Sequence, residues 1–353
     1  MKRRTVFRAA AGFLGLGTLG GLGASCASQS RNPYYQGPPS DHFDGTRFFN
    51  PGGAPPRGFA DIMRWRFGES PAEWPETVAL TDTARPATRA EELTVTMVGH
   101  ATMLLQVQGL NILTDPVWSK RASPFSFAGP KRVVAPGLAF EDLPAIDMVL
   151  LSHNHYDHLD MDTLKRLKQV HDPLVITPLG NDAIIAPTRL RCVTMDWGES
   201  TELGPLGIHC LPSHHWSARG VGDRSMALWA AFMLTGPGGP VLFVGDTGFD
   251  DGKPYRDLPQ RFGPLRAALL PIGAYDPRWF MADQHQNPDE AVRGFLMTRA
   301  AYAIGHHWGT IQLTNEARTA PRTDLLRALA RHGVPEARFR ALEPGETWTI
   351  PAL

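Results

Sequence analysis

Cysteine is scarce in this sequence, which has three in 353 residues and no C-x-x-C motif. The chain therefore lacks the cysteine density of a disulfide-stabilised scaffold and the spacing of a structural zinc site. Lysine plus arginine and aspartate plus glutamate both number 35, so the formal net charge is zero. Because no overall basic field is present to hold a nucleic-acid backbone, we do not expect the protein to bind DNA or RNA.

Long hydrophobic runs are also missing after residue 25. Before that point, a basic start with paired arginines, Met1–Arg8, precedes an uncharged, glycine-rich run, Ala9–Ser25. This pattern is typical of a twin-arginine export signal rather than a membrane span. We therefore predict an export signal over residues 1–26 and a location in the periplasm or cell envelope. Cys26 follows small residues that resemble a lipoprotein cleavage box, so a lipid anchor at Cys26 and ordinary cleavage nearby both stay open.

The rest of the chain has the composition of a globular protein, with 42% hydrophobic and 20% charged residues. Residues 27–58 are rich in serine, proline, glycine and asparagine, which predicts an extended tether. A short helix is expected within Phe59–Trp74. We assign residues 27–90 to a tether and N-terminal extension, and residues 91–353 to one folded domain.

Strands and helices alternate from Leu93 onward. The apolar patterns predict strands at 94–98, 102–107, 111–116, 147–152, 174–177, 208–213, 226–234, 241–244 and 302–305. Helical spacing predicts helices at 161–170, 288–299 and 323–332. This mixture predicts an α/β or α+β domain with layered sheets. Cys192 and Cys210 both fall in predicted strands, and whether they pair stays open.

One loop concentrates residues that can bind metal. His153-Asn154-His155-Tyr156-Asp157-His158 follows a predicted buried strand and has the form H-x-H-x-D-H. Two imidazoles two residues apart can converge on one ion, while the next aspartate and histidine turn towards a second. Imidazole with carboxylate and no thiolate suits Zn²⁺, with Fe or Mn as alternatives. The loop therefore predicts a metal centre for two ions.

Two ions need more than four ligands, and further candidates stand at the ends of predicted strands. They are the doublet His214-His215, Asp246 and the doublet His306-His307. Open sheets present ligand sites at the carboxyl ends of their strands. The residue types alone do not choose between the two members of each doublet.

Taken together, these residues resemble the metallo-β-lactamase superfamily: H-x-H-x-D-H after a strand, a distal histidine, Asp246 in Gly245–Gly248, and a final histidine. Longer strings resemble its N-acylphosphatidylethanolamine-hydrolysing phospholipase D branch; they are Ser152–Asp160, Pro271–Tyr275, Pro277–Met281, Gln284-His285 and His307–Thr310. The resemblance covers roughly residues 93–350. It implies an αβ/βα sandwich of two packed mixed sheets flanked by helices.

The resemblance also implies a dizinc site with seven ligand residues. It assigns one ion to His153, His155 and His215, the other to Asp157, His158 and His307, and a bridging position to Asp246. The family has tryptophan after each distal histidine, which matches His215-Trp216 and His307-Trp308. His214 and His306 are therefore expected to pack near the site without binding metal.

Supporting residues follow from the same resemblance. Asp115 occupies the place of a carboxylate that orients a ligand imidazole, although a turn-forming aspartate before proline is the alternative. Gln284 and His285 are predicted to contact the phosphate or the leaving group, with a purely structural loop role as the alternative. Arg278-Trp279-Phe280 is expected either to face a lipid or to anchor the loop.

The predicted reaction is hydrolysis of a phosphodiester. A pair of zinc ions lowers the pKa of bound water and can hold the attacking and leaving oxygens of a phosphoryl displacement. The resemblance implies Asp157 and Asp246 as catalytic carboxylates, an anionic phospholipid substrate and membrane association, with a homodimer left open. For N-acylphosphatidylethanolamine the products would be N-acylethanolamine and phosphatidate.

Two other functions stay open. A metal-dependent lactonase or other esterase of the same superfamily would use the same ligands on a different substrate. A non-enzymatic lipid-binding envelope lipoprotein would need no metal, and such proteins usually lose ligands. Here competent residues occupy all seven expected ligand positions, which favours an enzyme.

Overall fold

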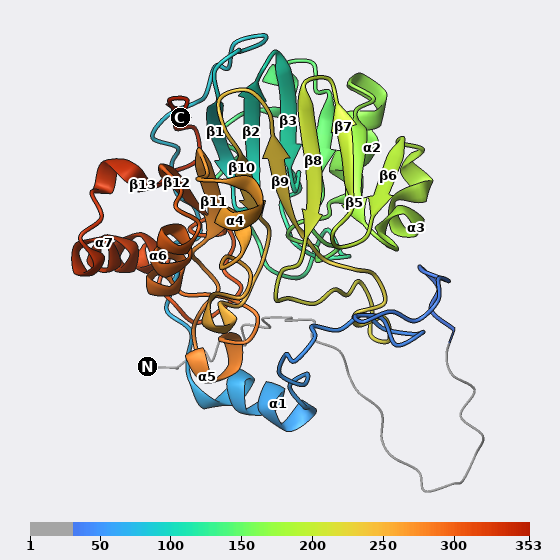
Figure 1. Ribbon diagram of the computed structural model, residues 1–353. Coiled ribbons are helices and arrows are strands. Elements are labelled where there is room, and N and C mark those ends of the chain that lie inside the picture. The colour runs from blue at the N-terminus through green and yellow to red at the C-terminus, as the bar shows by residue number, and fades with distance from the viewer. Residues whose placement is uncertain (1–30) are drawn as a thin grey trace, which may run out of the picture.

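A computed structural model describes residues 31–353 of the chain (Figure 1). The predicted export signal and Cys26 lie outside the described residues. Within residues 31–353, no helix is both long enough and apolar enough to cross a membrane.

Two mixed sheets of seven strands pack against each other (Figure 1). The first sheet has the order β14 (Thr347–Thr349), β1 (Thr94–Gly99), β2 (Thr102–Val107), β3 (Leu110–Thr114), β4 (Met148–Leu150), β5 (Leu174–Pro178) and β6 (Cys192–Met195). The second has the order β13 (Phe339–Ala341), β12 (Tyr302–His306), β11 (Ala267–Pro271), β10 (Val241–Val244), β9 (Ala231–Thr235), β8 (Leu206–Leu211) and β7 (Ser200–Leu203). The predicted sandwich of two mixed sheets is confirmed.

The core lies between the sheets because successive side chains of a strand point to opposite faces. In β2, Met103, Leu105 and Val107 join the cluster between the sheets, whereas Leu104 joins the cluster on the outer face of the first sheet. Every residue of β2 is buried, as expected of a strand that is covered on both faces. The strands are apolar along almost their whole length because apolar side chains pack in three places: between the sheets and on the outer face of each sheet.

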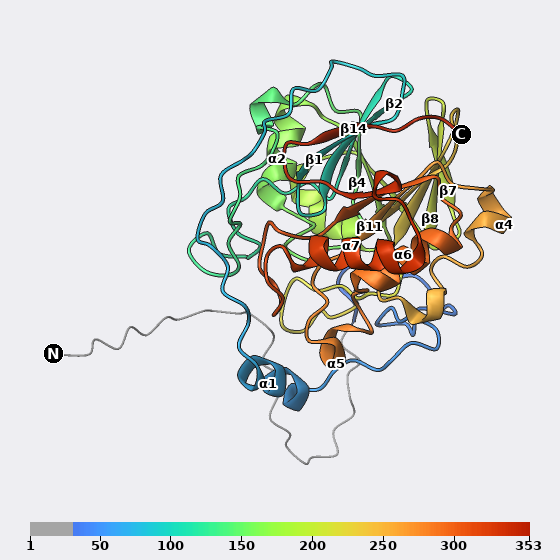
Figure 2. The same ribbon diagram turned by 90° about the vertical axis from the view of Figure 1, so that its left-hand side faces the viewer.

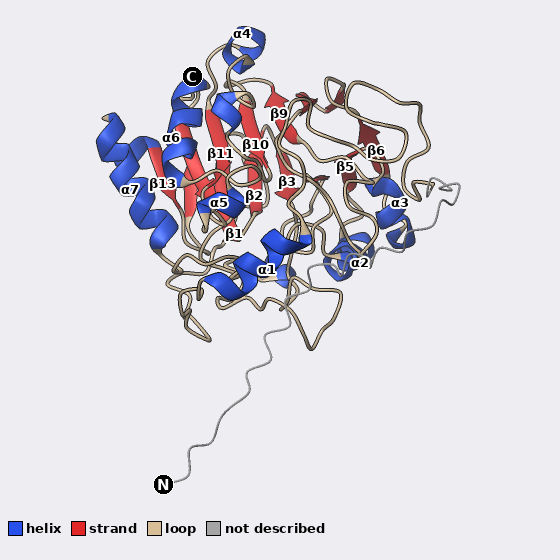
Figure 3. Cartoon of the chain, turned by 90° about the horizontal axis from the view of Figure 1, so that it is seen from below, coloured by secondary structure: helices blue, strands red, loops and turns tan. Residues whose placement is uncertain are grey.

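Helices supply the outer layers. On the first sheet, α2 (Met161–Val170) and α3 (Asn181–Ile185) pack through residues such as Leu164 and Ile185. On the second, α6 (Pro288–Met297) and α7 (Ala320–His332) lie side by side, with α4 (Leu258–Phe262) near the edge (Figure 2). The short helices α1 (Phe59–Gly68) and α5 (Arg278–Met281) lie below the sheets in the view of Figure 1 and face the viewer in Figure 3.

The strands that precede the candidate site residues run in one direction within each sheet. In the first sheet β1, β3 and β4 are parallel in sense, because β2 pairs antiparallel with both β1 and β3. In the second sheet the same holds for β8, β10, β11 and β12. Their carboxyl ends meet at one edge of the sandwich, where open sheets place ligand sites.

The N-terminal segment does not lie free as a tether. Phe43 and Phe48 are almost completely buried and pack with Leu228 and Trp229. The side-chain amide of Asn32 donates to the carbonyl of Met226 at 2.7 Å. The expectation of a tether is therefore wrong for residues 32–50, because composition predicts an extended backbone but not the contacts that this backbone makes.

Several element boundaries differ from expectation by a few residues, and the largest difference is at β9. The strand predicted over 226–234 begins only at Ala231, because the amide of Leu228 donates to Leu179 and that of Ala230 donates to Ser152 instead of a ladder partner. The short helix predicted within 59–74 is confirmed as α1.

The two described cysteines do not form a disulfide. Cys192 and Cys210 lie in different sheets, on β6 and β8, and both are free thiols. Burial raises the pKa of both, so they stay protonated at neutral pH.

Candidate metal centre

The histidine-rich loop leaves β4 at the lower edge of the first sheet. His153, Asp157 and His158 are buried, and His155 is half-buried. The loop turns back at once, because the amides of His158 and Leu159 both donate to the carbonyl of His155. Because of this tight turn, the side chains of His153 and His155 point to one side of the site, and those of Asp157 and His158 point to the other.

Three imidazoles converge on the first side of the site, and we call His153, His155 and His215 the three-histidine group. Nε2 of His153 lies 2.9 Å from Nδ1 of His155, which lies 3.2 Å from Nε2 of His215. His215 reaches this position from the loop after β8 in the second sheet. Such close approach of three ring nitrogens is typical of imidazoles that share one cation.

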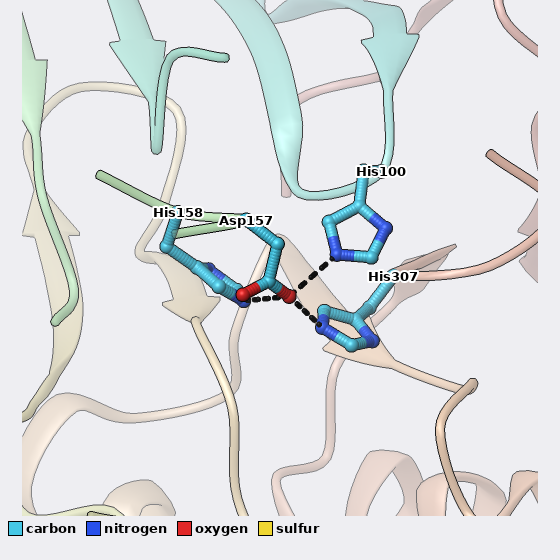
Figure 4. A group of neighbouring side chains, drawn as sticks. All are labelled: His100, Asp157, His158 and His307. Atoms are coloured by element: carbon cyan, nitrogen blue, oxygen red, sulfur yellow. Dashed lines mark hydrogen bonds and ion pairs between the residues drawn. The ribbon is translucent and has the colours of Figure 1, made fainter. Parts of the chain in front are cut away.

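The second side is organised around a carboxylate, and we call Asp157, His158 and His307 the Asp157 group; His100 lies against it. One oxygen of Asp157, Oδ2, has an imidazole Nε2 at 2.9 Å in His100, at 3.2 Å in His307 and at 3.4 Å in His158 (Figure 4). His307 follows β12 and has a positive φ of 63°. Residues from both sheets therefore meet here.

Asp246 lies between the two groups, in the loop after β10. Its Oδ2 is 3.2 Å from Nε2 of His158, 3.3 Å from Nε2 of His307 and 3.6 Å from Nε2 of His215. Its other oxygen, Oδ1, is buried without a hydrogen-bond partner. This position matches the bridging role that the resemblance implies for Asp246.

Asp115 supports both groups from the loop after β3. Its Oδ2 accepts hydrogen bonds from Nδ1 of His158 at 2.6 Å and from Oγ of Ser152 at 2.6 Å. Ser152 Oγ in turn contacts Nδ1 of His153 at 2.9 Å. Because Asp115 only accepts, Nδ1 of His158 carries a proton, and Nε2 is the nitrogen that would face a cation. Asp115 thus orients an imidazole as predicted.

Gly245 allows the loop that carries Asp246 to pass close to Ser152. A Cβ at Gly245 would collide with the side chain of Ser152. Since the loop after β10 must pass this close to Ser152, a larger residue would push Asp246 away from the cluster.

The unpaired atoms of the cluster fit a metal. Nε2 of His158, Oδ1 of Asp246 and Nδ1 of His285 are buried and have no hydrogen-bond partner, which is unusual for buried polar atoms. The ligand atoms of the three-histidine group and Asp246 all lie within 4.8 Å of one another, as do those of the Asp157 group. Imidazole nitrogens with carboxylate oxygens are a donor set that Zn²⁺ prefers.

The protonation states point to the same fit. Burial lowers the pKa of His155 and of His215 to about 3, so both stay neutral. Burial opposes the charge of Asp246 too, but His307 and His158 hold its pKa well below the usual value. The neutral nitrogens of the three-histidine group and the ionised carboxylate of Asp246 provide the lone pairs and the negative charge that a divalent cation needs. The nearby carboxylates raise the pKa of His158 and His307, so these two would release a proton when a cation binds.

The two doublets separate as the resemblance implies. His215 and His307 point into the cluster, whereas His306 Nε2 donates to the carbonyl of Val244 at 2.7 Å. His214 faces Asp250, with Nε2 3.2 Å from its Oδ2. Neither His214 nor His306 lies in the cluster.

Of the two loop residues after α5, His285 lies at the site and Gln284 contributes its backbone. Nδ1 of His285 is 3.8 Å from Oδ2 of Asp246. The carbonyl of Gln284 accepts from Nδ1 of His215 at 3.0 Å. Gln284 therefore orients a ligand imidazole, a role that its residue type does not reveal.

Arg278 anchors this loop instead of presenting a free cation. Its guanidinium donates to both oxygens of Glu290, at 2.9 and 2.8 Å, and to the carbonyl of His285 at 2.8 Å. Phe280 stacks on Trp65 of α1. Arg57, just before α1, forms an ion pair with Asp283 at 2.5 Å. The N-terminal extension is thus attached beside the loop that carries His285.

His100 is the residue that sequence reasoning missed. It lies in the turn between β1 and β2, and nothing in its neighbourhood forms a metal-binding motif. The only available signal was its position at the carboxyl end of a strand, which it shares with Asp246 and His307.

Comparison with known proteins gives this geometry a context. The family described as "Beta-lactamase superfamily domain" matches residues 110–308. N-acyl-phosphatidylethanolamine-hydrolyzing phospholipase D 1 of Caenorhabditis elegans is 40% identical over 269 residues, which are 72% of this chain and 75% of that protein. The mitochondrial N-acyl-phosphatidylethanolamine-hydrolyzing phospholipase D of Saccharomyces cerevisiae is 33% identical over 259 residues, which are 71% of this chain and 55% of that protein.

A solved structure shares the fold at lower identity. The isothiocyanate hydrolase from Delia radicum gut bacteria matches with a TM-score of 0.59 and 23% identity, over 73% of this chain and 100% of that chain. This likeness concerns the arrangement of sheets and helices.

Proposed function

This chain belongs to the metallo-β-lactamase superfamily, in its N-acylphosphatidylethanolamine-hydrolysing phospholipase D-like branch, and we propose that it is a dinuclear zinc phosphodiesterase that cleaves N-acylphosphatidylethanolamine. The identity with N-acylphosphatidylethanolamine-hydrolysing phospholipases D makes it a metal-dependent hydrolase. The observation that carries the substrate is the 40% identity, over most of the chain, with a protein named for that activity. The two adjacent ligand groups around Asp246 support a dinuclear centre.

The proposed reaction breaks the bond between phosphorus and the ethanolamine oxygen. The oxygen of a water molecule bonds to phosphorus, the ethanolamine oxygen leaves with a proton, and the products are phosphatidate and N-acylethanolamine. Two zinc ions, when bound, would activate the water and neutralise the charge of the phosphoryl group. One ion would be held by His153, His155 and His215. The other would be held by Asp157, His158 and His307, and Asp246 would contact both ions.

The protein's own groups then orient the reactants. Asp157 and Asp246 are the carboxylates nearest the reacting water in this proposal, and both stay ionised despite burial. Burial lowers the pKa of His285 to about 3, so His285 is neutral at pH 7. It would contact a phosphate oxygen or the leaving oxygen as a hydrogen-bonding group and not as a cation.

An exposed apolar face of α1 supports contact with a membrane that holds the substrate. Phe59, Met63 and Phe67 are exposed on α1 at intervals of four residues, which places them on one face of the helix. The opposite face of α1 is fixed at α5, where Trp65 stacks on Phe280 and Arg64 lies over Trp279. An exposed apolar stripe on a helix is typical of contact with a lipid interface.

We also propose that the protein acts outside the cytoplasm, after export through the signal at residues 1–26. The support is the paired arginines and the glycine-rich uncharged run. Mass spectrometry of the mature N-terminus tests this location. A diacylglyceryl group on Cys26 would add a lipid anchor, and an uncleaved Met1 would overturn the export proposal.

The substrate is tested by product identification. The purified zinc-loaded protein is incubated with N-acylphosphatidylethanolamine in mixed micelles, and products are identified by mass spectrometry. We expect phosphatidate and N-acylethanolamine, reduced on the order of a thousand-fold or more in Asp246→Asn, because that change removes the charge shared by both ions. Asp162→Asn, an exposed change on α2, is the matched control and should keep full activity.

Other outcomes separate the alternatives. Turnover of a lactone or a generic phosphodiester without cleavage of the phospholipid would discard the lipid assignment and favour another esterase of the superfamily. Metal analysis that finds no stoichiometric metal, together with no turnover, would favour a non-enzymatic lipid-binding protein. Iron or manganese in protein isolated without added zinc would replace zinc as the metal.

A further inference from the structure

His100 is held in the site by an unusual backbone turn. The β1–β2 register shifts between Met97 and Gly99, and His100 follows with a positive φ of 58°. Residues other than glycine adopt this conformation in only a few per cent of cases, with asparagine, aspartate and histidine enriched among them. The turn directs the imidazole into the site, where only 2% of the residue is exposed.

The backbone of His100 is bonded to the loop of the second sheet that carries His307. Its amide donates to Oγ1 of Thr310 at 3.0 Å. Its carbonyl accepts from the amide of His307 at 2.9 Å. These two bonds fix the position of the His100 backbone relative to a ligand residue, and they do not depend on the imidazole.

The imidazole makes one polar contact, with Asp157. Its Nε2 lies 2.9 Å from Oδ2 of Asp157, and its ring centroid is 4.0 Å from that of His307 (Figure 4). The contact pairs an imidazole nitrogen with a carboxylate oxygen that has no proton of its own. Since the ionised carboxylate only accepts, Nε2 is the nitrogen that donates.

We propose that His100 is a positioning residue whose Nε2–H holds Oδ2 of Asp157 in place and so sets the metal affinity of the Asp157 group. The carboxylate of Asp157 can change its orientation by rotation about χ1 and χ2. The other residues around its Oδ2 are themselves expected ligands. A hydrogen bond from outside the ligand set fixes which way the carboxylate faces before the ion arrives. This inference rests on the two-metal centre proposed above.

Two amide variants test the hydrogen bond. Glutamine places an amide N–H at nearly the reach of the histidine Nε2, whereas asparagine is one methylene shorter. Asparagine tolerates a positive φ, so His100→Asn keeps the turn and loses the contact with Asp157. His100→Gln keeps the contact. His209→Ala, a half-buried histidine on β8 outside the site, is the control.

The first measurement needs no substrate. Metal-free protein is titrated with zinc, the ions bound per chain are counted, and folding is checked by circular dichroism. For His100→Asn we expect two ions per chain at saturation, with the weaker step reduced about 10- to 100-fold in affinity. His100→Gln should lie within a few-fold of the parent, and His209→Ala should match it.

Two results would overturn the proposal. Unchanged zinc affinity in folded His100→Asn would make the imidazole a packing group only. Loss of one ion per chain in both variants, with an altered visible spectrum of the cobalt-substituted protein, would make His100 a direct ligand. Failure of the parent protein to bind two ions would instead count against the proposed function, so the two failures are distinguishable.

Discussion

The three-histidine group and the Asp157 group lie next to each other but differ in their charge. The first offers neutral imidazoles, since burial lowers the pKa of His155 and His215 to about 3. In the second, burial opposes a charged imidazole, but Asp246 and Asp157 nevertheless raise the pKa of His307 to about 9. One group is therefore ready to bind a cation, and the other must first release a proton.

The residues that support the two groups also differ. Asp115 bonds directly to His158 but reaches His153 only through Ser152. His100 contacts Asp157 and none of the three-histidine group. The three-histidine group is supported by Ser152 at His153 and by the carbonyl of Gln284 at His215, so each group has two supporting residues. Because the Asp157 group must also release a proton, we expect its metal to be the more easily lost.

Removing one ligand from each group gives the largest expected effect. His215→Ala should lose the ion of the three-histidine group, and His307→Ala the ion of the Asp157 group, each with at least about a hundred-fold loss of activity. Metal counting checks the stoichiometry. His214→Ala, one residue away and facing Asp250, should keep both ions; if it loses one while His215→Ala does not, the choice within the doublet is reversed.

Acidification should separate the groups without any mutation. His307 has a raised pKa of about 9, so metal binding there displaces a proton at any pH below that value. Between pH 8 and pH 6 the affinity of the Asp157 group should fall about ten-fold per unit for each proton displaced. His155 and His215 are already neutral in this range. If zinc titrations show the same pH dependence for both binding steps, the proposed difference between the three-histidine group and the Asp157 group is contradicted.

The smallest expected effects come from substitutions of the residues that hydrogen-bond to the candidate ligands. Asp115→Asn should weaken the Asp157 group about 10- to 100-fold, because it replaces the acceptor of His158 with a neutral amide. Ser152→Ala should weaken the three-histidine group by less than about ten-fold, the range of one neutral hydrogen bond. Zinc titration of each variant gives the ratio of the two binding affinities. If a variant loses affinity equally in both steps, the difference between the two groups is refuted.

The convergence of the candidate ligands at one edge could be predicted from the sequence because chain order and strand direction carry the information. His153, Asp246 and His307 each follow an apolar strand, and strands of the same sense end at one edge. The choice of His215 and His307 within their doublets came from the tryptophan that follows each. Their inward direction depends on backbone detail such as the positive φ of His307.

What could not be predicted arises from contacts between distant parts of the chain. His100 gains its significance from Asp157, 57 residues later, and an isolated histidine after a strand is common. The packing of Phe43 and Phe48 depends on Trp229 and Leu228, so a segment with the composition of a linker became part of the core. The role of Gln284 lies in its carbonyl, which every residue type has.

The ligands come from both halves of the sandwich: the first sheet supplies the loop after β4, and the second supplies His215, Asp246 and His307. Bound ions would therefore tie the two layers together at their lower edge, much as a cross-link does. Metal loading would then raise the resistance of that edge to proteases and slow its hydrogen exchange, while the opposite edge would respond far less. The centre that performs the chemistry would also hold the two layers closed around it.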